Sequence, residues 1–357
     1  MSHRRQYHQK GGDSDTRRTA RECLTRLQID LETLQPYGVT RQTSLHPDLK
    51  GPLSSAHAEY DAVTGDFYNF NLEFGRYATY RVFHTSLSTG ETEILATITG
   101  PQIKPAYIHS FFLTEDYVIL CIWPALFGAG GAQILWKRSL VDAIGFHPEL
   151  QSRWCVVDRR QGRGLVATFL SPAFFSFHTV NSWQEEGADG STDIFCDIVQ
   201  LPNSDILQVL QYDNLLSTGP GAGNHGGSWG TTLQRYRLAS IPKTGKMDAA
   251  TDADLPRAET VVSIDNEAVG DLPTFNPRFH TKKSRYVYNV TNRGLVSTSV
   301  SPASSSLTLD SPPSRTACPR LTPIPKISRY GAWRSTHRGR PFSSRMHTTS
   351  RKTPGSS

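Results

Sequence analysis

The chain has 357 residues, of which 37% are hydrophobic and 20% charged, so most of it can bury the core of one large or two ordinary domains. The net charge of +6 suggests nucleic acid at first sight, but its distribution argues against such a partner. Residues 301–357 hold ten Lys and Arg against one acidic residue, so this tail carries +9 and the remaining 300 residues carry about −3. The basic charge belongs to the tail rather than to the fold, and no nucleic-acid partner is expected.

The first twenty residues are polar and basic, which excludes a secretory signal peptide there. The longest apolar run, residues 117–132, is shorter than the ~20 residues of a spanning helix and is interrupted by Pro124 and glycines. The five cysteines form no CxxC or other metal-ligand spacing. We therefore expect a cytoplasmic, reduced protein without a signal peptide or transmembrane helix.

Composition divides the chain into three zones. Residues 1–28 are polar and aperiodic, and we expect a disordered or aberrant N-terminal segment. Residues 29–297 have the pattern of a globular all-β body. Residues 298–357 are basic and rich in Ser, Pro and Arg, with too little apolar surface to offset the entropy of ordering, and are expected to be disordered.

The body consists of short runs of β-branched and aromatic residues separated by turn signals. In chain order these runs predict strands at 66–72, 79–85, 92–98, 107–113, 117–123, 133–137, 154–158, 165–170, 174–183, 194–201, 231–238, 259–264 and 285–291. Helical pattern is limited to one or two turns at 139–144 and a short helix at 204–216. This arrangement is typical of a sandwich, a barrel or a propeller, and sequence periodicity alone does not choose among them.

Three histidines, His57, His109 and His178, lie in strand-like contexts at intervals of 52 and 69 residues. These intervals are too wide for a zinc finger or an HExxH helix, but they fit ligands delivered by separate strands that converge on one axis. A single histidine on an apolar strand is more often a core residue than a ligand. His84, His147, His225 and His280 are interpreted as surface or loop residues.

Each of these histidines stands in a distinctive short motif. The first motif is Ala-His-x-x-x-Asp-x-x-Thr-Gly at residues 56–65. The second and third are Tyr-Ile-His-Ser-Phe-Phe-Leu-Thr-Glu-Asp-Tyr from residue 107 and Phe-His-Thr-Val-Asn-Ser-Trp-Gln-Glu-Glu from residue 177. Two further motifs are Leu-Pro-Thr-Phe-Asn-Pro-Arg-Phe at 272–279 and Arg-Tyr-Val-Tyr-Asn at 285–289. The three histidine motifs resemble the iron-ligand motifs of the carotenoid cleavage oxygenase family, and all five occur in the family's order. The resemblance is closest to fungal torulene- and β-carotene-cleaving members.

The resemblance implies a seven-bladed β-propeller, incomplete here, with Fe(II) on its axis. The family holds the iron with four histidines, and His57, His109 and His178 match three of them. Neutral imidazoles suit iron and leave positions for dioxygen and substrate. Asp271 stands where the family has a glutamate that accepts a hydrogen bond from a ligand histidine, and it is one methylene shorter. Glu185 and Glu186 match acidic positions to which no role is assigned.

The implied activity is cleavage of a conjugated double bond in a carotenoid or apocarotenoid with O2, without a side-chain nucleophile or general base. The family also implies peripheral contact with a membrane that supplies the lipid-soluble substrate. The apolar segment 123–131 is a candidate for the hydrophobic mouth of such a site, and a buried strand and loop is the alternative. A His3 zinc hydrolase is a further alternative, although the chain places no general base for one.

The resemblance stops near residues 29 and 297, and no fourth metal ligand is found. The tail offers only His337 and His347, neither of them near an apolar strand. The abrupt loss of pattern at both ends is typical of out-of-frame translation. The alternative to a competent enzyme is therefore a non-catalytic propeller remnant, or the product of a wrongly assembled gene.

Overall fold

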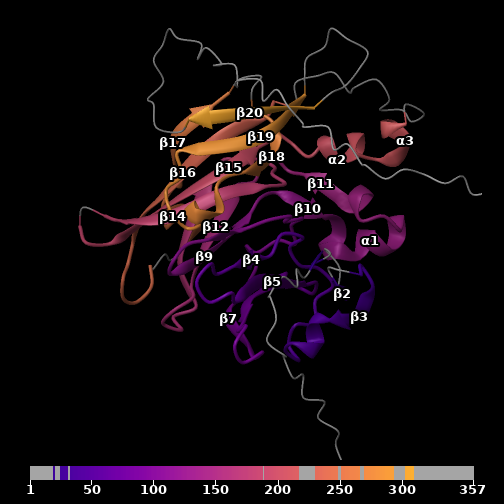
Figure 1. Ribbon diagram of the computed structural model, residues 1–357, viewed down its shortest axis with the longest axis horizontal. Coiled ribbons are helices and arrows are strands. Elements are labelled where there is room, and N and C mark those ends of the chain that lie inside the picture. Colours follow the sequence, from indigo (N-terminus) through magenta and orange to yellow (C-terminus); the bar gives the residue numbers. More distant parts are fainter. Residues whose placement is uncertain are drawn as a thin grey trace, which may run out of the picture. The chain divides into compact units, whose positions relative to one another are not determined.

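The computed structural model describes residues 19–20, 25–30, 33–187, 189–216, 230–247, 251–265, 269–292 and 302–308. The chain divides into two compact units, Met1–Pro312 and Pro313–Ser357, and every described residue belongs to the first. The fold within this unit is almost entirely β-structure (Figure 1). No helix among the described residues is long and apolar enough to cross a membrane.

Three four-stranded antiparallel sheets form the centre of the unit, and in each the strands are hydrogen-bonded in sequence order. Blade 1 consists of β4 Glu59–Tyr60, β5 Phe67–Glu73, β6 Thr79–Thr85 and β7 Thr92–Thr99. Blade 2 consists of β8 Phe112–Leu113, β9 Tyr117–Ile122, β12 Ser152–Asp158 and β13 Leu165–Ser171. Blade 3 consists of β14 Thr179–Glu186, β15 Thr192–Gln200, β16 Thr232–Ile241 and β17 Glu259–Ile264.

Two three-stranded sheets flank these blades in the sequence. Blade 4 consists of β18 Asp271–Thr274, β19 Tyr286–Asn292 and β20 Pro302–Thr308. The N-terminal sheet consists of β1 Thr19–Ala20, β2 Thr25–Ile29 and β3 Pro36–Arg41. Successive four-stranded meanders are the repeating unit of a β-propeller, so the all-β propeller expected from the sequence is confirmed.

Two longer insertions separate consecutive strands of blades 2 and 3. The hairpin of β10 Ala125–Phe127 and β11 Ile144–Phe146 lies between β9 and β12, and it encloses helix α1 Ala132–Lys137 (Figure 1). Helices α2 Ile206–Val209 and α3 Tyr212–Leu215 lie between β15 and β16. The 3-10 turns span Gln42–Ser44, Gly128–Gly131, Val141–Ala143, Asp252–Asp254 and Pro277–Phe279.

Apolar side chains between neighbouring blades form the core. One buried cluster runs through blades 1, 2 and 3, and its aromatic rings pack across the blade boundaries, as Trp154 does against Tyr236 with ring centroids 4.9 Å apart. A second cluster, which includes Val180 and Val287, joins blade 3 to blade 4. In β9 every residue is buried, which explains why its sequence is continuously apolar rather than alternating.

Several local predictions differ from the structure. Residues 133–137 belong to helix α1 rather than to a strand. Gly131 and Arg138, the residues on either side of this helix, adopt left-handed conformations, and these reverse the chain before and after it. The helix expected at 204–216 is two short helices separated at Leu210. Strand β20 lies inside the segment 298–357 expected to be disordered, and β1 and most of β2 lie inside 1–28. The rest of both segments, including His337 and His347, lies outside the described residues.

Candidate metal centre

The three motif histidines occupy equivalent places in the three complete blades. His57 lies two residues before β4, His109 three residues before β8, and His178 directly before β14. These are the first strands of blades 1, 2 and 3, each at an edge of its sheet. Because the blades repeat one topology, residues at the same place in each are brought around one point.

The three imidazoles meet at that point. Each offers one ring nitrogen to a group whose ligand atoms all lie within 4.8 Å of one another. The ring centroids are 4.7 Å apart for His57 and His109, 5.0 Å for His57 and His178, and 5.1 Å for His109 and His178. Among the described residues no further His, Cys, Asp or Glu joins this group.

Nε2 of His57 and Nε2 of His109 lie 3.1 Å apart. Two nitrogens this far apart subtend about a right angle at an ion bound roughly 2.1 Å from each. A right angle is the spacing of neighbouring ligands in an octahedral or square arrangement and is narrower than the tetrahedral angle that zinc prefers. The His57–His109 pair therefore has the spacing of two neighbouring ligands of such an ion, and neutral imidazoles are suitable donors for Fe(II).

Buried serines fix the backbones that carry the histidines. The Ser55 hydroxyl lies 2.9 Å from the His57 carbonyl oxygen and 2.7 Å from that of His109. The Ser110 hydroxyl donates to the Phe177 carbonyl oxygen and accepts from the Thr179 N–H, both at 2.7 Å. Each serine therefore ties one ligand segment to the next. Ser55 stands directly before the first motif and Ser110 within the second, but the sequence gives no sign that these serines bridge blades.

Asp271 orients His178. Its carboxylate oxygen Oδ1 lies 2.8 Å from His178 Nδ1, and because an ionised carboxylate only accepts, Nδ1 carries the proton and Nε2 keeps its lone pair. The carboxylate reaches the imidazole although aspartate is one methylene shorter than glutamate. Its backbone position depends on close packing: a Cβ added at Gly270 would lie 1.8 Å from the Val290 carbonyl oxygen.

We expect Asp271→Asn to weaken metal binding by roughly 10- to 100-fold, the usual cost of removing a partner of a ligand histidine. An amide presents either an oxygen or an N–H to Nδ1 and removes the negative charge that polarises the ring. Titration with Co(II), followed by visible absorption, measures the affinity. Asp271→Glu serves as the matched control, since it keeps the charge. Equal affinities for Asp271→Asn and the unsubstituted chain would show that Asp271 does not support the site.

A hydroxyl and two aromatic rings surround His109. The Tyr107 hydroxyl lies 3.1 Å from His109 Nδ1, so this ring nitrogen has a polar neighbour as His178 Nδ1 does. The Phe177 ring packs edge-on against His109, with ring centroids 5.5 Å apart. Tyr107 and Phe177 are both buried, and they exclude water from this side of the imidazole.

The remaining sequence candidates lie away from the histidines. Glu185 accepts a hydrogen bond from Trp183 Nε1 at 2.8 Å, and Glu186 pairs with Lys243 at 2.9 Å. The residues Trp123, Ala125 and Phe127 are buried in the core, so this part of segment 123–131 is a buried strand and loop.

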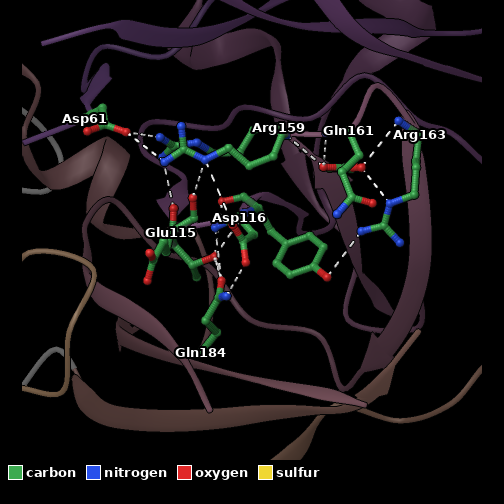
Figure 2. A network of polar contacts seen from close by, with 11 residues as sticks. Asp61, Glu115, Asp116, Arg159, Gln161, Arg163 and Gln184 are labelled. Atoms are coloured by element: carbon green, nitrogen blue, oxygen red, sulfur yellow. Dashed lines mark hydrogen bonds and ion pairs between the residues drawn. The ribbon is translucent and has the colours of Figure 1, made fainter. Parts of the chain in front are cut away.

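Asp61, the aspartate of the first motif, belongs to a buried polar network (Figure 2). Three residues of this network follow a candidate ligand by four to six positions in the chain: Asp61, Thr114 and Gln184. Its carboxylate contacts the guanidinium of Arg159 and lies 3.2 Å from Arg160 Nη2. Arg159 Nη1 donates to the Thr114 carbonyl oxygen at 2.9 Å, and the Thr114 hydroxyl donates to Gln184 Oε1 at 2.8 Å. The network thus joins blades 1, 2 and 3, through Asp61 and Thr114 directly after β4 and β8 and through Gln184 near the end of β14.

Burial of Asp61 acts to raise its pKa, but hydrogen bonds from the Val63 and Thr64 N–H groups and the charge of Arg159 outweigh it, so the pKa is lowered from 3.8. A carboxyl whose pKa is lowered in the folded state stabilises the fold above its unfolded pKa. That stability is lost as the pH falls through the folded value.

The free energy of unfolding of the chain is therefore expected to fall as the pH drops below about 4. Asp61→Asn removes this titrating group, and its unfolding free energy should fall less steeply over the same pH interval. Urea unfolding at a series of pH values measures both slopes. Glu186→Gln, which removes an exposed carboxyl, provides the comparison. Identical slopes for Asp61→Asn and the unsubstituted chain would contradict this assignment.

The comparisons with known proteins agree with this arrangement. The sequence profile described as "Retinal pigment epithelial membrane protein" matches residues 19–312, which is most of the chain. The chain belongs to this family. It is 41% identical to a carotenoid dioxygenase of Neurospora crassa over 280 residues, and 41% identical to a torulene dioxygenase of Fusarium fujikuroi over 281 residues. It is 28% identical over 210 residues to the human mitochondrial carotenoid-cleaving dioxygenase.

The family relatives are longer than this chain. The Neurospora match covers 76% of this chain and 46% of the relative, and the Fusarium match covers 75% and 48%. The chain therefore spans about half the length of the fungal proteins it matches.

Solved structures share the fold at low sequence identity. A Synechocystis apocarotenoid oxygenase variant superposes with a TM-score of 0.53 at 17% identity, covering 82% of this chain and 57% of that protein. The lignostilbene dioxygenase of Pseudomonas brassicacearum superposes with a TM-score of 0.50 at 20% identity, covering 76% and 50%.

Proposed function

We propose that the chain binds Fe(II) through His57, His109 and His178 and belongs to an enzyme that cleaves a conjugated double bond of a carotenoid or apocarotenoid with O2. The observation that carries the proposal is the convergence of one histidine from each of three successive blades. The activities named for the fungal relatives support the substrate class. Because this chain spans about half of those relatives, its own competence is part of the proposal.

In this reaction the residues of the chain bind the ion and orient its ligands. The three imidazoles hold the ion in their neutral form, with Nδ1 of His178 protonated toward Asp271. Tyr107 and Phe177 keep water from one side of His109. Bound iron would supply the activation of dioxygen, and no nucleophile or general base from the protein is needed.

A second candidate is a chain that binds metal without turning over substrate. The observation that favours it is that, within the described ranges, three histidines rather than four form the group. Such a chain would bind metal at the same three nitrogens but would not cleave a polyene.

Incubation of the iron-loaded chain with an apocarotenal in air distinguishes the two candidates. Cleavage gives a loss of polyene absorption and two carbonyl products that mass spectrometry identifies. The matched control is the chain with His57, His109 and His178 all replaced by alanine. If the loaded chain forms no more product than this control, the catalytic proposal is wrong and the non-catalytic candidate stands.

We also infer that the protein contacts a membrane surface through helix α1. Leu135 and Trp136 in this helix are 84% and 89% exposed, and Lys137 and Arg138 follow them directly. Exposed apolar side chains beside basic ones are typical of a segment that lies in the lipid interface. A hydrogen bond of 3.1 Å from Gln211 to Asp142 brings the α2–α3 segment, with its own exposed apolar side chains, near this helix.

Trp136→Glu is expected to reduce binding to anionic lipid vesicles at least tenfold, because it removes the largest exposed apolar group and adds a charge that the lipid repels. Sedimentation with vesicles of phosphatidylcholine and phosphatidylserine measures the bound fraction. Val63→Glu is the control, because Val63 is 93% exposed in a turn of blade 1. Equal loss for both variants would exclude α1 as a specific contact.

A further inference from the structure

A loop of blade 4 contacts both β4 and β14, the strands that follow His57 and His178. The loop between β18 and β19 contains the turn Pro277–Phe279, followed by His280. Its backbone is fixed by Asn181, a buried residue of β14 that lies three residues after His178. The Asn181 amide donates to the Phe279 and Lys282 carbonyl oxygens at 3.0 and 2.7 Å, and its carbonyl accepts from the Thr281 N–H at 3.2 Å.

The same loop reaches blade 1. His280 Nε2 lies 3.0 Å from Glu59 Oε2, and both side chains are only 22% exposed. These residues are 221 positions apart in the chain. Blades 1, 2 and 3 follow one another around the site, so a loop of blade 4 that contacts blade 1 closes the arc of strands around the histidines.

The first strand of blade 1 has a short ladder. Strand β4 pairs with β5 through only two residue pairs, Glu59 with Tyr68 and Tyr60 with Phe67. Strand β8 of blade 2 is held by two pairs as well, whereas β14 pairs with β15 over its whole length. His57, two residues before β4, is the exposed member of the histidine group. A short ladder and an exposed ligand make the position of His57 sensitive to contacts outside its own sheet.

We propose that Glu59 and His280 are positioning residues of the metal centre. The loop anchored on Asn181 holds Glu59 through His280, and Glu59 fixes the start of β4 and with it His57 relative to His178. This inference rests on the proposed metal-binding function, and it concerns affinity and geometry rather than the chemical step. His280 lies in a loop, as the sequence predicts, and the proposal gives this loop residue a role.

Titration with Co(II) tests the pair, because the visible spectrum of Co(II) reports both affinity and coordination geometry. We expect His280→Ala to weaken Co(II) binding roughly tenfold, the lower end of the cost of losing a supporting contact, and to change the spectrum. His280→Gln places an amide N–H near the position of Nε2 and is expected to restore most of the affinity. His84→Ala is the matched control. His84 lies in blade 1, as Glu59 does, its side chain is 21% exposed, and it pairs with Glu93 at 3.2 Å.

The outcomes are distinct. His280→Ala could lower the melting temperature and still bind Co(II) with the affinity and spectrum of the unsubstituted chain. In that case the pair of Glu59 and His280 is merely structural and the proposal is wrong. It is equally wrong if His280→Gln binds as weakly as His280→Ala, or if His84→Ala weakens binding as much. If His280→Ala does not fold, His280→Gln and Glu59→Gln compared with the control decide the question. An unsubstituted chain that binds no more Co(II) than the triple-histidine variant refutes the proposed function itself, and the positioning role with it.

Discussion

Replacement of His109 by alanine is expected to lower the affinity of the chain for Fe(II) by more than a hundredfold. His109 provides the nitrogen that lies 3.1 Å from that of His57, and its ring also packs against His178. Removing it leaves two imidazoles, and the loss of a direct ligand should exceed the 10- to 100-fold cost of losing a partner of a ligand.

Anaerobic equilibrium dialysis against Fe(II), with the metal measured by mass spectrometry, gives the affinity of each variant. His147→Ala is the control, since His147 is 43% exposed and pairs with Glu149 on a loop. If the affinity of His109→Ala for Fe(II) is within threefold of that of the unsubstituted chain, the ion binds elsewhere.

Replacement of Arg159 by methionine is expected to destabilise the fold by about 3–5 kcal/mol, the cost of leaving a buried charge without its partner. The side chains of Arg159 and Asp61 are 1% and 7% exposed. The guanidinium also stacks over the Tyr68 ring, 4.5 Å from its centroid, and donates to the Thr114 carbonyl oxygen. Methionine keeps the apolar stem and removes all of these polar contacts.

Urea unfolding followed by circular dichroism measures the change. Arg237→Met is the matched control, because Arg237 pairs with Asp193 at 2.7 Å but is 35% exposed, and should cost no more than about 1 kcal/mol. The double replacement Asp61→Leu and Arg159→Met removes both charges and should recover part of the loss. A cost for Arg159→Met no larger than that of Arg237→Met would show that the network does not join the blades.

The sequence was sufficient to predict the propeller class and three residues that the structure brings together at one point. His57, His109 and His178 stand in specific short motifs, and each histidine precedes the first strand of a blade, so local sequence identifies them. Asp271 was identified for the same reason. The role of these residues as metal ligands remains a proposal.

Contacts between distant segments were not predictable in this way. Nothing near His280 or Glu59 indicates that the two meet, because the contact depends on how blade 4 folds back toward blade 1. The pairing of Asp61 with Arg159 likewise joins residues 98 positions apart. The sequence does not predict helix α1 because Ile134 and Trp136 favour strands by propensity, whereas in the structure a glycine turn precedes them and a short helix follows it.

X-ray absorption at the iron edge of the Fe(II)-loaded chain tests the central claim most directly, because it identifies the atoms bound to the metal. The account predicts one iron per chain with the scattering of imidazole rings, lost when His57, His109 and His178 are all replaced by alanine. Iron that shows no imidazole scattering, or that the triple variant retains unchanged, would contradict it.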